Sequence, residues 1–304
     1  MKNFLLTAVA LLLSVMTAAQ TDYEMVVEKT DGSKSVFNTN IIKQTYFQKL
    51  DQESGIFQGA KRVFGNNLVK AFGEEGEDRY EITYDAKGFV TSINRTIFYE
   101  SGNRLYSWLF NYNTAGKIII NYYRDGMLYN VYYATVGSNG YISSIRIEQS
   151  FEATLSYDNE EHLTQIMYYD IEEEEGASIY YDTDTFSWMD GDLIRDCYHE
   201  YDDDEDYSNI AYISPSQTSP IENVAGIMEF DHGMNIDMDD FSVLYYIGGW
   251  GRGTKHLPMA WVSDSGSGNN AWTLDTQNRA IKLVHNRKYN SDSESTTRTF
   301  FWEW

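Results

Sequence analysis

The chain contains 304 residues, of which 46 are acidic and 23 are basic, so its formal net charge at pH 7 is −23. A surface with this charge repels a phosphate backbone, which argues against a nucleic-acid partner. The 25 tyrosines and seven tryptophans favour β-strands, and only three prolines are present to interrupt strand ladders. Length and composition therefore predict an acidic all-β protein with one large domain or two smaller ones.

The N-terminal segment has the features of a secretory signal peptide. Lys2 supplies a positive charge, residues 5–15 form an apolar core too short to span a bilayer, and small residues precede Gln20. We predict that residues 1–19 are removed by cleavage between Ala19 and Gln20. The mature protein is therefore expected in the periplasm, at the cell surface or outside the cell.

The cysteine content limits how the exported protein is held and stabilised. A bacterial lipoprotein carries a cysteine directly after the apolar core of its signal, but the single cysteine of this chain is Cys197. We therefore expect no lipid anchor of that kind. One cysteine also excludes an intrachain disulfide, so burial and ladder hydrogen bonds must stabilise the fold.

Residues 20–50 are predicted to form a small N-terminal hairpin unit. Asp31-Gly32, a dipeptide typical of hairpin turns, separates two apolar segments at 25–29 and 35–37. Residues 41–47 are a candidate third strand.

The hydrophobic periodicity then fades, and glycines become frequent. We predict an irregular linker over residues 51–78 and a hairpin-repeat domain over residues 79–304.

One hairpin motif recurs throughout the repeat domain. In residues 84–93 an aromatic residue enters the turn, Asp85 caps it through its side chain, Gly88 takes a positive-φ position and alternating apolar residues leave. Other copies, some of them looser or shortened, occupy residues 112–118, 136–145, 157–166, 188–194 and 274–283. These repeated reversals predict a many-stranded antiparallel up-and-down meander that forms a barrel or half-barrel.

Aromatic residues alternate along two of the expected strands. Every second residue from Tyr106 to Tyr112 is aromatic, and we assign Tyr129, Val131 and Tyr133 to a similar face. Such faces pack into a core or line a surface that binds a ligand. The acidic runs at residues 172–175 and 202–206 are interpreted as solvated loop tips.

One short helix is expected near residues 238–247. Asp237 is its N-cap, Leu244 and Tyr245 continue an apolar face, and Gly248 ends it. Because the glycine-rich segment 248–255 follows a helix instead of preceding one, it does not predict a phosphate site.

Patterns typical of metal or catalytic sites are weak. Asp202, Asp204 and Asp206 resemble the start of a calcium loop, but Tyr207 and Ile213 occupy the positions that require Gly and Glu. The five histidines show no metal-ligand spacing. We therefore predict no cofactor and no metal site.

Cys197 and His199 would share one face of a strand, as a thiolate and its base do. A buried thiol beside a surface imidazole explains the same pattern without catalysis. Paired carboxylates of a glycoside hydrolase are a further alternative, but no local pattern selects a pair. We assign no catalytic residues and no particular ligand-binding residues.

The hairpins of the form Tyr-Asp-x-x-Gly-x-Val/Ile resemble those of Tyr-Asp repeat proteins. Together with the signal segment, Tyr245-Tyr246-Ile247-Gly248 and Lys255-His256-Leu257-Pro258, they make the chain similar to an exported gut-bacterial envelope family. That family is described as a domain of unknown function with a porin-like fold. The resemblance covers roughly residues 79–304 and implies a barrel or half-barrel with no established activity.

Three functional hypotheses remain open. The first is a non-enzymatic, exported cell-envelope β protein whose partner is an apolar ligand such as a lipid, a glycan or another envelope protein. The second is an integral outer-membrane β-barrel, favoured by the alternating aromatics up to Trp304 but opposed by charges such as Arg146 and Glu148 along one strand. The third is a carbohydrate-active hydrolase.

Overall fold

A computed structural model describes residues 24–28, 34–38, 56–147, 151–171, 178–199, 205–227, 243–290 and 295–304. The chain divides into two compact units, Met1–Asp51 and Gln52–Trp304. The predicted signal segment, with its cleavage site between Ala19 and Gln20, lies outside the described residues.

The N-terminal unit contains the predicted hairpin. Strands β1 (Glu24–Glu28) and β2 (Lys34–Asn38) pair antiparallel, with Met25 opposite Phe37. The candidate third strand at 41–47 lies outside the described residues.

The second unit is a closed antiparallel barrel in which each strand pairs with its neighbours in the sequence. This confirms the predicted up-and-down meander and shows that it closes completely. Closure joins the last strand to the first, with Trp302 opposite Phe72. The sixteen strands among the described residues are β3 (Ala71–Glu74), β4 (Asp78–Tyr84), β5 (Val90–Ile97), β6 (Arg104–Asn111), β7 (Lys117–Arg124), β8 (Met127–Val136), β9 (Ile142–Ile147), β10 (Phe151–Tyr157), β11 (Leu163–Ile171), β12 (Ser178–Met189), β13 (Asp192–His199), β14 (Glu205–Ala211), β15 (Ala260–Ser263), β16 (Gly266–Leu274), β17 (Ala280–Tyr289) and β18 (Ser295–Glu303).

The inner face of the wall holds most of the core. Along β6, Tyr106, Trp108 and Phe110 are buried while Leu105 and Leu109 are exposed, as the two-residue period of a strand requires. The outer face carries many polar and charged side chains, among them those of Glu81, Thr83, Lys117, Asn269 and Lys282. Apolar burial toward the barrel axis therefore stabilises this barrel.

The side chains of β8 do not face as we expected. We assigned Tyr129, Val131 and Tyr133 to an aromatic face like that of residues 106–112, but the buried aromatic residue is Tyr132, which is 2% exposed, while Tyr129 and Tyr133 are 55% and 37% exposed. This strand has aromatic residues on both faces, so alternation alone did not decide which face is buried. Pairing of Tyr132 with the buried Ile120 of β7 places it inside.

Four of the repeat turns share one hydrogen-bond pattern. In these turns the peptide N–H of the fifth residue of the motif bonds back across the turn, as Gly88 N does to Asp85 O at 3.0 Å, and Gly140, Glu161 and Asn278 make the same bond. Asp85 Oδ1 also accepts the N–H groups of Lys87 and Phe89, at 2.8 and 2.9 Å. Asp158 and Asp275 do the same in their turns. The fifth residue has a positive φ at Gly88, Gly116, Gly140, Glu161 and Asn278.

Six aromatic residues at or next to a strand end, four of them the first residue of a motif copy, have a role that the sequence pattern did not reveal. The hydroxyl or indole N–H group of each residue donates a hydrogen bond of 2.7 to 2.9 Å to a backbone carbonyl. The acceptor is the residue at which the chain re-enters the wall after the preceding connection. The six donors and their acceptors are Tyr84 to Val69, Tyr112 to Val90, Tyr157 to Ile142, Trp188 to Leu163, Tyr212 to Leu193 and Trp304 to Ala280. These bonds join neighbouring hairpins around the rim that carries the repeat turns, which we call the repeat rim.

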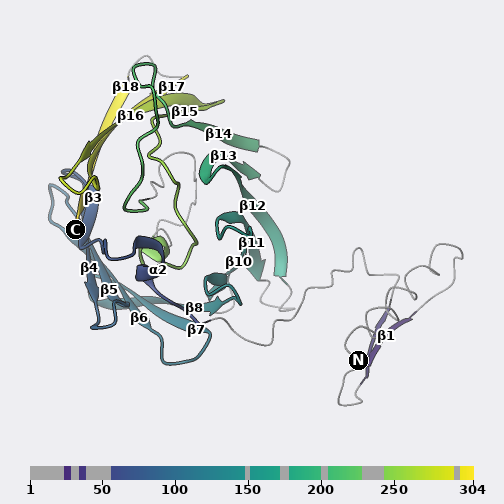
Figure 1. Ribbon diagram of the computed structural model, residues 1–304. Helices are drawn as coiled ribbons and strands as arrows, with labels where there is room; N and C mark the ends of the chain where they lie inside the picture. Colours follow the sequence, from purple (N-terminus) through teal and green to yellow (C-terminus); the bar gives the residue numbers. More distant parts are fainter. Residues whose placement is uncertain are drawn as a thin grey trace, which may run out of the picture. The chain divides into compact units, whose positions relative to one another are not determined.

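The barrel end at the repeat rim is filled by the plug, defined as residues 56–70, 221–227 and 243–259. Figure 1 shows α2 (Ala60–Phe64) inside the ring of strands, together with the connection between β14 and β15. Helix α3 (Val243–Tyr246) is fully buried. The rings of Phe72 and Tyr246 stack with centroids 3.8 Å apart, which packs the plug against the wall.

Two predictions about this region change. The described helix near 238–247 begins at Val243, ends before Gly248 at φ 80°, and Asp237 lies outside the described residues. The predicted linker at 51–78 is wrong, because it contains α2, β3 and the start of β4. Its described glycines, Gly59, Gly65, Gly73 and Gly76, lie at the ends of α2 and in the β3–β4 hairpin, so they do not mark an irregular linker.

Candidate ligand-binding site

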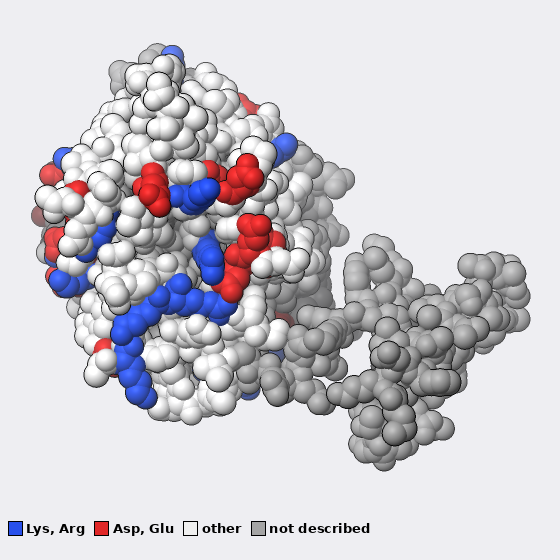
Figure 2. All heavy atoms as spheres, in the orientation of Figure 1, with Lys and Arg blue, Asp and Glu red and all other residues white. Residues whose placement is uncertain are grey.

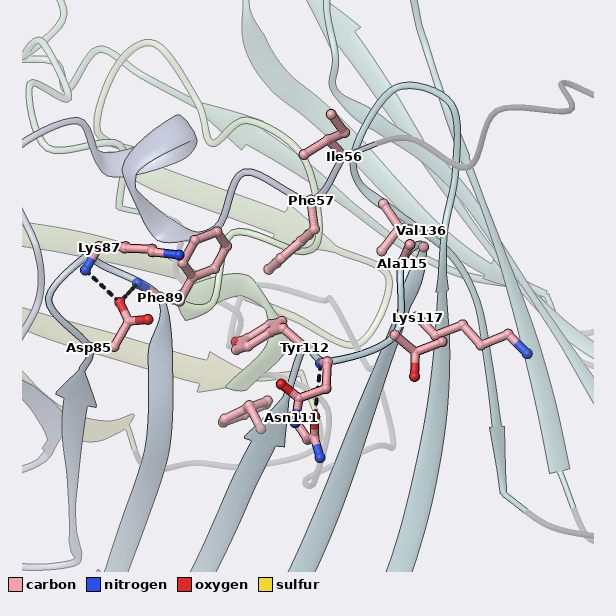
Figure 3. A pocket seen from close by; sticks show the side chains of 14 residues that line it. Ile56, Phe57, Asp85, Lys87, Phe89, Asn111, Tyr112, Ala115, Lys117 and Val136 are labelled. Atoms are coloured by element: carbon pink, nitrogen blue, oxygen red, sulfur yellow. Dashed lines mark hydrogen bonds between the residues drawn. The ribbon is translucent and has the colours of Figure 1, made fainter.

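A cavity of about 690 Å³ opens at the repeat rim, within the size range of small-molecule sites. Three segments form it: residues 56–57 at the start of the plug, the turn between β4 and β5, and the turn between β6 and β7. Figure 3 shows the rings of Phe57, Phe89 and Tyr112 grouped on one side and Ala115 on the other.

The three rings make a rigid aromatic wall. Phe57 stacks on Tyr112 with centroids 5.5 Å apart and an interplanar angle of 12°. Phe89 lies 5.3 Å from Tyr112 at 50°. Tyr112 is fixed by its hydrogen bond to Val90 O, and burial raises the pKa of its hydroxyl well above the usual range. The wall therefore presents uncharged aromatic faces at any physiological pH.

Polar groups of the two turns border this wall. Hydrogen bonds from the backbone of Phe89 and Lys87 lower the pKa of Asp85, which keeps the carboxylate charged. Asn111 Oδ1 accepts the N–H of Asn113 at 2.9 Å and shapes the second turn. Aromatic faces pack on the apolar faces of sugar rings, and amides, carboxylates and ammonium groups bind their hydroxyls. The site has both components.

A cluster around Glu161 holds the plug segment that carries Phe57. Glu161 Oε1 lies 2.5 Å from Arg62 Nη2 of α2, while Oε2 accepts Tyr141 Oη and Arg252 Nε, each at 2.9 Å. Burial opposes ionisation of Glu161, but the bonds from Arg62 and Tyr141 outweigh it and lower the pKa of this carboxyl group. Glu161 takes the positive-φ position of its turn, at 74°, where other copies have glycine. The side chain thus links the rim to the plug.

The candidate catalytic pair lies outside the cavity. The register places Cys197 opposite Thr185 and His199 opposite Thr183, so the two share one face of β13, as predicted. Cys197 is a buried thiol. Neither residue lines the aromatic cavity.

Buried carboxylates occur on the inner face of β12. Asp184 Oδ2 accepts Tyr168 Oη at 2.5 Å, and Asp182 Oδ2 accepts Tyr198 Oη at 2.6 Å. Burial raises the pKa of Asp184 to about 7. These tyrosine bonds account for the burial of both carboxylates structurally.

Two of the described histidines lie at the repeat rim, while His285 is buried within β17 beside Asn270. His162 contacts Asp158 at 3.1 Å and stacks on Trp188, and His256 contacts Asp192 at 2.7 Å. Across the described residues no group of three His, Cys, Asp or Glu side chains is placed to hold a metal ion. His232, Asp202 and Asp204 lie outside those residues.

Sequence reasoning missed the cavity residues. The sixth motif position is Phe89 in the first copy, but Tyr141, His162 and Arg279 in later ones, and Phe89 and Tyr141 contact Phe57 and Arg62 of the plug. Phe89 and Tyr112 are aromatic residues close to adjacent turns, and this pattern could have indicated an aromatic cavity there. Phe57 was hidden within the segment that we predicted to be a linker.

No protein-family model and no curated protein matches this chain. Among solved structures it is similar to a porin-like protein from Bacteroides uniformis, with 16% identity, a TM-score of 0.60, and coverage of 83% of this chain and 99% of that chain. A porin-like protein from Bacteroides vulgatus is 12% identical over 78% of this chain and 98% of that one, with a TM-score of 0.40. The first likeness establishes the porin-like barrel fold.

Proposed function

We propose that this protein is a non-enzymatic, exported β-barrel of the cell envelope that binds a glycan in the cavity at the repeat rim. The observation that carries the proposal is the wall of Phe57, Phe89 and Tyr112 beside polar turn residues. We also propose that it belongs to the exported gut-bacterial envelope family that its hairpins resemble.

A glycan fits this site better than a lipid does. A lipid tail needs a long, uniformly apolar cavity, whereas Asp85, Lys87 and Asn113 border this one. The inner face of the barrel near the plug is packed with core side chains such as Trp108, Tyr122 and Trp250. The exposed mixed surface at the rim therefore supports a polar ligand with apolar faces.

The inner and outer faces of the barrel wall can be compared with those of a barrel embedded in a membrane. A barrel embedded in lipid carries an apolar band on its outer face and a polar interior. Here the apolar side chains face inward and many polar ones face outward. No helix within the described part of the chain is long and apolar enough to span a membrane.

One observation favours the outer-membrane barrel as a second candidate. An exposed apolar group lies near the rim opposite the repeat rim, and it includes Phe98, Tyr99, Met127, Leu128 and Tyr129. Cell fractionation separates the two candidates. Recovery without detergent supports the proposed envelope protein, and recovery only from detergent-extracted outer membrane supports the alternative.

Glycan binding is tested with purified protein on an oligosaccharide array and by calorimetry on any hit. We expect Phe89→Ala and Phe57→Ala to weaken binding by about 10-fold or more, because aromatic contacts contribute on the order of 1 kcal/mol or more. Phe98→Ala, which removes an exposed ring at the opposite rim, is the matched control and should bind normally. Loss in all three variants, or no binding to any glycan, would refute the proposal.

A further inference from the structure

Lys87 lines the Phe89 side of the cavity and Lys61 lies beside its turn, although the chain as a whole is strongly acidic. Figure 3 shows the side chain of Lys87 extending alongside the Phe89 ring. Figure 2 shows a band of Lys and Arg side chains across the same face, over the position of α2. The net charge of −23 makes this band a local exception.

Lys61 of α2 lies against the turn that carries Lys87. A Cβ atom built on Gly88 would lie 2.5 Å from Lys61 Cε and 3.1 Å from Lys61 Nζ. Lys61 Nζ of α2 therefore lies beside the turn that carries Lys87. Like charges brought together repel each other, and a bound anion removes this cost.

Neither lysine is held in an ion pair with another described residue. The neighbouring arginines, Arg62 and Arg252, by contrast both pair with Glu161. Asp85 belongs to the same turn and its charge interacts with Lys87, but its Oδ1 accepts two backbone N–H groups, and it forms no ion pair with either lysine. The cationic end of the cavity is thus available to an external anion.

We infer that the ligand is an anionic saccharide, whose sugar ring stacks on the aromatic wall while a carboxylate or sulfate group binds Lys61 and Lys87. This inference rests on the proposed glycan-binding function and names the ligand class. Lys117 lines the cavity but extends away from the rings in Figure 3, so it does not contribute to this anchor. The shared chemistry is an exposed negative charge attached to a pyranose ring.

The test uses matched oligosaccharides that differ only in charge. One pair is a uronate trisaccharide and its carboxyl-reduced counterpart, and the other is a sulfated trisaccharide and its desulfated form. We expect the charged member of one pair to bind about 10-fold more tightly at low salt, and this preference to shrink as ionic strength rises. The pair that shows the preference identifies the anionic group.

Variants test the anchor itself. Lys61→Gln/Lys87→Gln should lose about 10-fold in affinity for the charged saccharide and nothing for its neutral counterpart. The matched control, Lys282→Gln/Lys288→Gln on β17, changes the net charge equally but far along the chain from the cavity and should keep the preference. Circular dichroism confirms folding of both double variants.

The experiments distinguish failure of the anionic ligand class, of the lysine anchor and of glycan binding itself. If charged and neutral saccharides bind equally and Phe89→Ala abolishes both, glycan binding stands and the anionic class is wrong. If charge preference survives in Lys61→Gln/Lys87→Gln, the anchor is wrong. If no saccharide of either pair, and none on the array, binds the wild-type protein, both this inference and the proposed function are wrong.

Discussion

The two rims of the barrel use the same backbone conformations in different surroundings. At the repeat rim the Asp190-Gly191 turn has φ values of 53° and 85°, and at the opposite rim Asp125-Gly126 has 49° and 80°. Both are hairpin turns that require positive φ at two successive residues. At the repeat rim, however, the turns contact the plug, and their neighbours bond to one another through the aromatic donors.

Two glycines show how the surroundings differ between the plug and the opposite rim. Gly248 in the plug and Gly126 at the opposite rim both have φ 80°. A Cβ on Gly248 would lie 2.4 Å from Gly59 O, whereas a Cβ on Gly126 would meet nothing within 4 Å. These two glycines therefore share a backbone φ, but only Gly248 lies in close contact with a distant backbone segment.

The largest expected effect separates these two glycines. Gly126→Ala should cost about 1 kcal/mol, the penalty for an L-residue at positive φ. Gly248→Ala should cost roughly 3 kcal/mol or more, because it adds the clash with Gly59 O to the same backbone penalty. Urea unfolding of both variants measures the difference. Equal losses would mean that the plug shifts freely away from the rim.

A second comparison concerns carboxylates. At the repeat rim the pKa of Glu161 is lowered, so its contribution to stability is present above the unfolded pKa and lost as pH falls. Asp184 on the inner wall is the reverse case, because burial raises its pKa to about 7. The unfolded chain then releases this proton first as pH rises. The stability associated with the protonated Asp184 is complete below about pH 4 and is lost on going up to about pH 7.

Asp184→Asn removes this dependence and keeps an oxygen that accepts the Tyr168 hydroxyl. We expect the variant to be more stable than wild type by about 2 kcal/mol at pH 8, and its advantage to shrink toward pH 4. Chemical unfolding at several pH values measures both, with Glu160→Gln at the exposed rim as the control. An advantage that did not change with pH would show that Asp184 does not titrate in this range.

The smallest expected effect tests the hydrogen bonds between hairpins. Tyr157 Oη contacts Ile142 O at 2.7 Å and Gly249 O at 3.1 Å, so it joins a neighbouring hairpin to the plug. Tyr157→Phe should cost about 1.5 kcal/mol, because the buried carbonyls lose a donor. Tyr99→Phe, at an exposed position near the opposite rim, should cost less than about 0.5 kcal/mol. Similar losses from thermal or urea unfolding would show that the rim bonds add no stability.

The repeat turns could be predicted in detail because their chemistry is local. Asp85, Gly88 and Phe89 lie within five residues, and the bonds that define the turn join only these neighbours. The same spacing located the positive-φ position in a copy where Asn278 replaces glycine. The antiparallel meander follows from repeating such turns.

The cavity could not be predicted from the same information. It depends on Phe57 meeting Tyr112, and on α2 lying inside the barrel. The plug is also joined to the rim by the pair of Arg62 and Glu161, 99 residues apart. No turn motif or periodicity in either segment encodes such a meeting.

By itself the sequence determined the turns, the antiparallel order of strands and the expectation of a curved all-β wall, because each depends on residues close together in the chain. Only the tertiary structure decided that the wall closes, that residues 56–70 belong to a plug, and that Tyr132 faces inward. Closure pairs β18 with β3, and Lys70 with Trp304, 234 residues away. Which distant surfaces meet is determined by the packing of the whole chain, so the aromatic cavity and its lysines became visible only in the folded barrel.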